Sequence, residues 1–590
     1  MEDNEARAAC LIPLQTYDSA TVERRSSSDH HAMESKTEPL SQDPETPRTK
    51  VDLDTILVEE LGQFGRFQLR TLCLTMIAVV FSAFHAEYVF TTARINTRCL
   101  IPECEDQSTA VYSPDWILNA VPATTSGFDN CNRYNNRTTY VNTTDSCPAN
   151  LFDTNTVISC RQYVYENQLT VVYDYDLACD EWRRTLIGFV RTFGTLAALP
   201  ITGYISDRWG RRFALALNAF NTSWVGLARY WAGTYLGFTI SQFVEAMLGG
   251  GVFSCTFILV QELVGPKYRT IAGAILTTGF AVGQVFMGFI AWGVPAWRPL
   301  TLVLYIPQLI TIIYFWLVPE SVRWLMSKGR YAESEAILKN VARINGKVLS
   351  DKSLEALRHT AEEEKKRQEA EKEIKKNEPW LIVLVFRHKR ILLRCMVSPV
   401  WWVTTTLVYY GLTINAVNMS GNQYINYVAV AAAEIPGFWL AVLLIGRIGR
   451  KPVLIGGYWM CAACQIGYIF MPDGMYAVSL TVYVIGKIAI ATVVTSIYMY
   501  TTEIYPTRYR HNLFAFSSMI GRIGSIVAPL TPAIGASTIE ELPFILFAGF
   551  ALVSGALVFL TPETMGTKLP DTMEEASAIG LEKKLASNTH

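Results

Sequence analysis

The chain has 590 residues, of which 50% are hydrophobic and 17% are charged, and its formal net charge is −1. A soluble protein of this length is rarely so apolar, so the composition indicates that the lipid bilayer is the main solvent. The balanced charge says nothing about acidic partners, and we expect no nucleic-acid partner. We also see no phosphate-binding loop, metal-ligand cluster or activated nucleophile in the sequence, and therefore expect neither an enzyme nor a bound metal or cofactor.

The N-terminal region is polar and rich in Ser, Thr, Glu and Asp over its first 50 residues. It lacks the apolar core of a signal peptide, so membrane insertion is expected to begin with an internal apolar segment. We predict that residues 1–68 form a disordered cytoplasmic tail.

Twelve apolar runs follow, each long enough for the roughly 20 residues that a membrane-spanning helix needs. They begin near Leu69, Leu186, Phe213, Tyr235, Ile271, Pro299, Ile391, Tyr424, Val453, Tyr476, Leu513 and Leu542. We predict two bundles of six helices, at residues 69–318 and 391–561. A cytoplasmic linker that contains helices is expected at 319–390, and a cytoplasmic tail at 562–590.

A polar region at residues 95–182 separates the first two runs and carries half of the chain's cysteines. Two N-glycosylation sequons there begin at Asn136 and Asn142. An even number of cysteines beside sequons is typical of an oxidising, extracellular loop. We therefore predict three disulfides, whose 15 pairings the sequence leaves open, among Cys99, Cys104, Cys131, Cys147, Cys160 and Cys179.

The short loops between the runs differ in basic residues. The links near 207–212, 266–269, 446–451 and 506–511 each hold two or three Lys or Arg, whereas three alternate links in the second half hold none. Positive charge favours the cytoplasmic side. We therefore expect a multi-pass protein of the cell membrane with the cysteine-rich loop outside and both termini in the cytoplasm.

Three short motifs each occur twice, in the same order and about 240 residues apart, which indicates a tandem duplication. Two parallel repeats of membrane helices around a central site are typical of transporters that work by a rocker switch. The pairs are Gly203-x-x-x-Asp207-Arg208-x-Gly210-Arg211-Arg212 with Gly446-Arg447-x-Gly449-Arg450-Lys451, then Glu262, Pro266 and Arg269 with Glu503, Pro506 and Arg510, then Pro319-Glu320-Ser321 with Pro562-Glu563-Thr564.

The charges of these motifs are expected to pair across the two halves and close the inner mouth of the transporter. An exposed pair contributes only about 0–1 kcal/mol, so such a gate needs several of them. The alternative is that the charges merely set the topology and anchor helices at the headgroups. The predicted gate residues are Asp207, Arg211, Glu262, Arg269, Glu503 and Arg510.

The stretch Gly203–Arg212 resembles the signature of the major facilitator superfamily. Together with the cysteine-rich loop, the stretches Pro319–Leu325 and Thr502–Arg510 resemble the organic cation/anion/carnitine transporter family within it. The match runs from about residue 61 to 570. The resemblance implies an all-α membrane protein with the major facilitator fold, twelve transmembrane helices in two six-helix repeats, and a large disulfide-bonded outer loop.

Ionisable residues at mid-membrane depth by default indicate a transport pathway. Glu434, Lys487 and Arg522 are the main candidates, although a structural bridge between Glu434 and one of the bases is the alternative. Trp402 and Tyr409 are seven residues apart, hence on one helix face, where aromatic rings attract ammonium groups. The resemblance implies that Trp402, Tyr409 and the following Tyr410-Gly411 belong to an aromatic segment that lines the central cavity. Glu245 is a further ionisable candidate, and weaker candidates are Glu87 and Arg191, which lie near span ends, and Tyr498 and Tyr500.

The resemblance also sorts substrates. A base at Arg522 is the pattern of anion and carnitine transporters, whereas an acid at Glu434 is that of cation and carnitine transporters; Phe438 replaces a lysine expected in anion exchangers. One acid and two bases suit a small solute with an amine and a carboxylate, such as carnitine or β-alanine. An organic anion exchanger and a non-transporting receptor or scaffold remain alternatives. Expected partners are the solute and the lipid bilayer, a co-transported ion is left open, and a monomer is expected.

Overall fold

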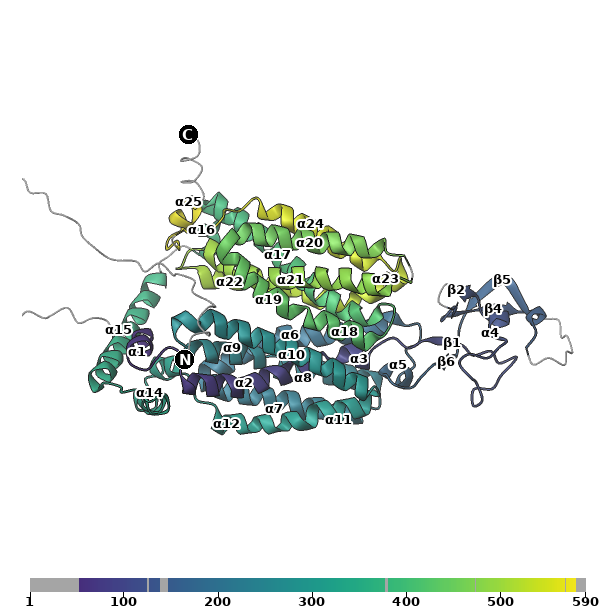
Figure 1. The fold of residues 1–590 in the computed structure, drawn as a ribbon, viewed down its shortest axis with the longest axis horizontal. Helices are drawn as coiled ribbons and strands as arrows, with labels where there is room; N and C mark the ends of the chain where they lie inside the picture. Colours follow the sequence, from purple (N-terminus) through teal and green to yellow (C-terminus); the bar gives the residue numbers. More distant parts are fainter. Residues whose placement is uncertain are drawn as a thin grey trace, which may run out of the picture. The chain divides into compact units, whose positions relative to one another are not determined.

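The computed structural model describes residues 52–124, 127–137, 147–376, 380–472, 474–567 and 569–579. Within them, ten helices are long and apolar enough to cross a membrane. Two more, α7 (Arg211–Ala228) and the shorter apolar helix α24 (Leu542–Val558), lie among these and bring the number to twelve (Figure 1). The predicted set of twelve helices, six in each half, is confirmed.

The helices of the first repeat, which we call the N-half, are α2 (Arg66–Ala83) continued by η1 (Phe84–Glu87) and α3 (Tyr88–Thr91), α6 (Glu181–Trp209), α7, α8 (Tyr235–Gly249) with α9 (Val252–Leu263), α10 (Arg269–Gly293), and α11 (Trp297–Gln308) with α12 (Tyr314–Leu317). Those of the C-half are α17 (Lys389–Asn415), α18 (Gln423–Ala432) with α19 (Glu434–Ile448), α20 (Arg450–Ile469), α21 (Tyr476–Ile504), α22 (Arg510–Val527) with α23 (Thr531–Ser537), and α24.

The run of three glycines at 249–251 separates α8 from α9 within one membrane-spanning stretch. A Cβ on Gly249 would overlap the side chain of Thr222 on α7, and one on Gly251 would overlap Thr202 on α6. The glycines therefore allow three helices of the N-half to approach closely, which larger residues would prevent.

The predicted N-terminal tail is shorter than expected, because helix α1 (Leu53–Glu59) lies within it and α2 already begins at Arg66. Leu53, Ile56 and Leu57 share one face of α1 and are buried in a cluster with apolar residues of the linker. The linker helices are α13 (Val322–Ser327), α14 (Tyr331–Asn345), α15 (Asp351–Lys376) and α16 (Leu381–Arg387). Burial against the linker orders a segment that looks polar as a whole.

The described residues of the cysteine-rich region between α3 and α6 form three two-stranded antiparallel sheets, two short α-helices and one 3-10 helix, η2 (Ala149–Leu151). Strand β1 (Thr97–Cys99) pairs with β6 (Tyr163–Tyr165), β2 (Ala123–Thr124) with β3 (Gly127–Phe128), and β4 (Asn132–Asn136) with β5 (Phe152–Ser159). The α-helices are α4 (Ile117–Ala120) and α5 (Val171–Asp174). Strands are therefore present in this region, whereas the membrane-spanning part is helical.

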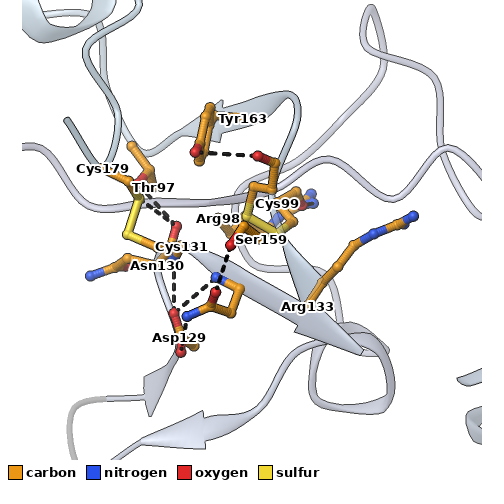
Figure 2. Close-up of a disulfide and its surroundings, with 12 residues drawn as sticks. Thr97, Arg98, Cys99, Asp129, Asn130, Cys131, Arg133, Ser159, Tyr163 and Cys179 are labelled. Carbon is orange, nitrogen blue, oxygen red and sulfur yellow. Dashed lines mark hydrogen bonds between the residues drawn. A yellow bond between two sulfur atoms is a disulfide. The ribbon is translucent and has the colours of Figure 1, made fainter. Parts of the chain in front are cut away.

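Three disulfides hold this region together, as predicted, and they select one of the 15 pairings: Cys99–Cys160, Cys104–Cys147 and Cys131–Cys179. Figure 2 shows Cys131 bonded to Cys179. Cys179 directly precedes Asp180, the N-cap of α6. The carboxylate of Asp129 accepts hydrogen bonds from the backbone N–H groups of Cys131 (2.8 Å) and Asn132 (3.0 Å). A turn and a disulfide thus join the sheets to the membrane helices.

The predicted glycosylation sites fall at the edge of this fold. Asn136 is exposed at the end of β4, with its amide nitrogen 3.4 Å from a Glu103 carboxylate oxygen. Asn142 lies outside the described residues. Glycosylation stays a prediction at both positions.

The two ends of the helical bundle differ. Helices α1, α14 and α15 lie at one end, which we call the linker end, and the cysteine-rich region lies at the other, which we call the disulfide end (Figure 1). At the disulfide end the halves touch, since a Cβ on Gly188 of α6 would be 2.8 Å from Pro529 of the C-half. Between Tyr88, Gly188, Val417 and Pro529, a cavity of about 20 Å³ remains, which is room for about one water.

Candidate functional site

The repeated motifs of the N-half converge on the start of α7. Gly210 separates α6 from α7 with φ +105°, and a Cβ there would overlap the carboxylate of Glu320. That carboxylate accepts the backbone N–H groups of Arg211 (2.9 Å) and Arg212 (3.1 Å), which have no partners within their own helix. Glu320 therefore takes the place of the side-chain cap that glycine lacks.

The C-half repeats this arrangement. Gly449 has φ +98°, and the carboxylate of Glu563 accepts the backbone N–H groups of Arg450 (3.0 Å) and Lys451 (2.9 Å) at the start of α20. The Arg450 guanidinium then pairs with Glu503 at 3.0 Å. In the N-half, Arg211 likewise lies 3.4 Å from Glu262 and 3.1 Å from Asp207. We call each set of three converging motifs a motif cluster.

The predicted gate residues pair differently from what we expected. The ion pairs of Arg211 join only N-half residues, and the pair of Glu503 joins only C-half residues, so these charges do not bridge the halves in this structure. Arg510 donates to the hydroxyl of Thr507 (3.0 Å). The reason is local: each arginine begins a helix and reaches the nearest acid or hydroxyl of its own repeat. The motif clusters therefore brace each half from within.

Arg269 has a partner that the sequence analysis missed. Its guanidinium lies 2.6 Å from Asp54 on α1, and Arg323 of α13 contacts the same carboxylate. Partial burial would raise the pKa of Asp54, but hydrogen bonds from Arg269 and Arg323 outweigh it, and the pKa is lowered. Asp54 thus connects helix α1 to the N-half through two arginines. The sequence does not predict this contact, because a single aspartate in a polar segment looks like any solvated charge.

The central charges lie in the C-half. The Lys487 ammonium on α21 is 2.9 Å from a Glu434 carboxylate oxygen on α19, and both side chains are fully buried. Lys487 also donates to the Tyr409 carbonyl (2.9 Å) and the Thr413 hydroxyl (2.7 Å) and lies 3.6 Å from the centre of the Tyr409 ring. Glu434 and Lys487 therefore neutralise each other, as the structural-bridge alternative expects.

Arg522 is separate from this pair. It is partly buried on α22, beside the Tyr410 hydroxyl, and within the described residues no salt bridge joins it to an acid. Helix α22, which carries Arg522, packs against α6 of the N-half, so Arg522 and Tyr410 lie near the meeting of the two halves. Tyr409 and Tyr410 are consecutive, so one contacts the Glu434–Lys487 pair and the other Arg522.

The candidate aromatic residues differ in how far they are exposed. Trp402 is buried, donates from its indole N–H to Thr501 (3.2 Å) and packs edge-on against Tyr498 with ring centres 4.7 Å apart. Tyr498 and Tyr410 are 45% and 37% exposed, whereas Tyr409 is 8% exposed. The two tyrosines with accessible rings are therefore Tyr498, a weaker candidate from the sequence, and Tyr410, which the family resemblance indicated but the seven-residue spacing did not.

A second buried charge network fills the N-half. Arg229 contacts both Glu87 and Glu245, and Arg191 lies 3.2 Å from Glu245. The Tyr305 hydroxyl lies 3.1 Å from Glu245. Two acids and two bases cancel, so this network carries no net charge. Arg229 was missed because it follows the third apolar run directly and looks like a loop residue.

One polar side chain crosses from the N-half to the central pair. Gln284 of α10 donates from its amide to Glu434 at 3.1 Å and accepts from the Tyr427 hydroxyl at 3.3 Å. Gln284 gives no signal in the sequence, because an uncharged amide in a membrane helix is commonly used for packing alone. Glu434 is therefore held by both halves at once.

Comparison with known proteins gives the family. Residues 120–575 match the sequence profile of the sugar (and other) transporter family. Solute carrier family 22 member 3 of Mus musculus is 30% identical over 546 residues, covering 89% of this chain and 95% of its own length. The organic cation transporter protein of Drosophila melanogaster is 29% identical over 89% of this chain and 94% of its own length.

Solved structures agree on the fold. The inward open xylose transporter XylE from E. coli aligns with a TM-score of 0.53 and 16% identity over 70% of this chain and 92% of its own. A partially occluded inward open form aligns with the same TM-score and 14% identity over 85% of this chain. At such identities the likeness shows the fold alone. With its fold, its duplicated motif clusters and its relatives, this chain is a membrane transporter that belongs to solute carrier family 22 of the major facilitator superfamily.

Proposed function

We propose that the protein moves small organic zwitterions or cations, such as carnitine, β-alanine or related amine solutes, across the plasma membrane by rocker-switch alternating access. One observation carries the zwitterion reading: Arg522 lies beside Tyr410 at the meeting of the halves with no acid paired to it among the described residues, while Glu434 and Lys487 form a closed pair. A guanidinium that no described acid neutralises can bind a carboxylate.

The amine of the solute would bind to the exposed aromatic rings near Arg522. The exposed rings of Tyr410 and Tyr498 attract an ammonium group by roughly 0.5–2 kcal/mol, depending on desolvation. Glu434 supplies the acid, with Lys487 released to the solute's carboxylate or to the Tyr409 and Thr413 oxygens it already contacts. In this proposal all the predicted substrate residues take part in binding. Trp402 acts indirectly, by packing against the ring of Tyr498.

The motif clusters have a role in the same cycle. Because their pairs lie within each half, we propose that they keep each half rigid while the halves rock against each other. The few exposed pairs contribute modestly, so the two states stay within the few kcal/mol that a solute can shift. The residues in question are Asp207, Arg211, Glu262, Arg269, Glu503 and Arg510.

Uptake by cells expressing the chain tests the substrate class. Labelled carnitine is compared with a permanent ammonium that lacks a carboxylate and with a carboxylate that lacks an amine. We expect carnitine uptake to fall at least tenfold in Arg522→Asp and to be largely kept in Arg522→Lys, which retains the charge. Uptake of the permanent ammonium alone, unaffected by Arg522→Asp, would overturn the zwitterion reading.

An organic anion exchanger is the second candidate, and a specific observation favours it. Lys487 neutralises Glu434, so the remaining charge among these three residues is positive. The carboxylate without an amine decides between the two functions: its uptake in preference to carnitine, with Tyr410→Leu harmless, would establish the anion exchanger. Tags at each terminus and in the cysteine-rich region, probed on intact cells, test the expected orientation.

A further inference from the structure

Gln284 is placed to connect the central site with the closure of the disulfide end. Its side chain is 4% exposed, and both ends of its amide bind C-half residues: the nitrogen donates to Glu434 (3.1 Å) and the oxygen accepts from Tyr427 (3.3 Å). A buried amide with both groups satisfied across an interface depends on the two surfaces staying together, because separation leaves it without partners.

The contact lies in a close seam between α10 and α18. One turn beyond Gln284, a Cβ on Gly288 would be 2.6 Å from the side chain of Val428, so only glycine permits this approach. Phe90 of α3 completes the seam from the N-half, with its ring 4.8 Å from that of Tyr427 and 5.4 Å from that of Tyr424. The Gln284 side chain reaches Glu434 only because the helices are this close.

Glu434 divides its two carboxylate oxygens between the halves. One oxygen faces Lys487 of the C-half at 2.9 Å and the other accepts from Gln284 of the N-half. An ammonium that binds Glu434 needs one of these oxygens. The neutral Gln284 donor is easier to displace than the Lys487 cation, since hydrogen bonds between two charged groups are stronger than those with one neutral partner.

We propose that Gln284 is a positioning residue that holds the disulfide end closed through Glu434, and that a solute ammonium competes with it and so promotes opening. The second half of this statement rests on the proposed function, because it needs an amine-bearing solute. The first half does not, since it concerns the empty transporter. Because the Glu434 carboxylate would accept either Gln284 or the solute ammonium, binding of the solute is coupled to separation of the two halves at the disulfide end.

The structure provides a matched control on the same two helices. The indole N–H of Trp439 on α19 donates to the Thr278 hydroxyl on α10 at 3.2 Å. This bond also crosses between the halves, but it does not touch Glu434. Thr278→Val therefore removes one inter-half hydrogen bond and leaves the proposed competition intact.

The first arm of the test measures closure without any solute. Val417 lines the small cavity between the halves at the disulfide end. The rate at which a membrane-impermeant maleimide labels Val417→Cys reports opening of the disulfide end. Labelling of the parent chain, which keeps the exposed Cys73, is measured in parallel and subtracted as background. We expect Gln284→Leu to raise this rate about tenfold, and Gln284→Glu, which places two carboxylates together, to raise it at least as much. Thr278→Val is expected to change it less than threefold.

The second arm adds carnitine or the permanent ammonium to the same variants. We expect either amine, if the uptake assay shows that it is carried, to speed labelling in the chain with Gln284 and to have little further effect in Gln284→Leu. Equal labelling of Gln284→Leu and Thr278→Val without solute would overturn the closure role. A carried amine that leaves labelling unchanged would overturn the competition. Failure of every amine in the uptake assay rejects the proposed function instead, and the first arm still decides on Gln284.

Discussion

Glu320 and Glu563 occupy equivalent places in the two repeats, each with its carboxylate on the first backbone N–H groups of the helix that follows the glycine–arginine motif. The two acids differ in surroundings. Glu320 is 6% exposed, whereas Glu563 is only partly buried. The same carboxylate–backbone contact therefore occurs once in a buried site and once in a partly exposed site. Its contribution to the stability of the fold can be compared between the two sites within a single chain.

The two acids are expected to respond to pH with opposite signs. Burial raises the pKa of Glu320 above its ordinary 4.5. For Glu563 burial also acts upward, but four backbone N–H donors outweigh it, and the pKa is lowered. A raised pKa gives stability that is present below pH 4.5 and lost as the pH rises through the folded value; a lowered one gives stability present above pH 4.5 and lost as the pH falls.

Glu563→Gln is therefore expected to cost about 1 kcal/mol at pH 7, with the cost shrinking as the pH falls below 4.5. The cost of Glu320→Gln is expected to grow as the pH falls through the raised pKa. Melting temperatures of the purified variants in detergent between pH 4 and pH 8, each compared with the parent chain, measure both slopes. Parallel slopes for the two variants would contradict the assignment.

Gly210 and Gly449 should not tolerate a side chain. Both combine positive φ with extended ψ (162° and 169°), a region that is essentially restricted to glycine and costs other residues roughly 1–3 kcal/mol. A Cβ would also press on Glu320 or lie 2.9 Å from a Glu563 oxygen. We expect Gly210→Ala and Gly449→Ala to lower stability by about 2 kcal/mol or more. Gly203→Ala and Gly446→Ala are the controls, because no atom lies within 4 Å of a Cβ there. These helical positions should be unchanged or slightly more stable.

The Glu434–Lys487 pair should show strong coupling. Removing one partner of a fully buried pair leaves an uncompensated charge and costs about 3–5 kcal/mol, whereas replacing both is much cheaper. We expect Lys487→Met and Glu434→Gln each to lose most folded protein in size-exclusion profiles, and the double variant to recover it without recovering transport. Thr413→Val, which removes only a neutral partner of Lys487, should fold normally. Additive losses would show that the two groups act independently.

The N-half network should be equally sensitive. Glu245→Gln deprives Arg229 and Arg191 of a shared carboxylate, so we expect a loss of about 3–5 kcal/mol in thermal unfolding assays. Ser241→Ala removes a neutral contact to Arg229 (3.2 Å) and should cost only about 1 kcal/mol. If both variants behaved alike, the network would be solvated rather than buried.

The fold was predictable because its signals are long. Apolar runs of membrane length gave the twelve helices, even α7, where Asn218 and Asn221 interrupt the apolar pattern. Cysteine pairing was not predictable, since it depends on the tertiary fold: Cys131 and Cys179 are 48 residues apart in the chain and lie together only in the folded cysteine-rich region.

The site was predictable in its residue types but not in its pairs. Lys487 and Arg522 are both bases in consecutive membrane helices, and only the rotation of α21 against α19 determines which one meets Glu434. Similarly, Tyr409 and Tyr410 are neighbours that point to different surroundings, and the seven-residue spacing favoured the less accessible of the two. Gln284 carries no charge and so gave no signal at all.

The motif clusters also bear on how the chain is made. The N-half cluster is complete once Glu320 has joined Gly210 and Arg211, so it can close while the second repeat is still on the ribosome, as successive units of a large chain generally do. The C-half cluster needs Glu563, which follows α24, and closes only after the twelfth helix has been synthesised. During that interval the nascent chain holds one complete motif cluster and one incomplete motif cluster.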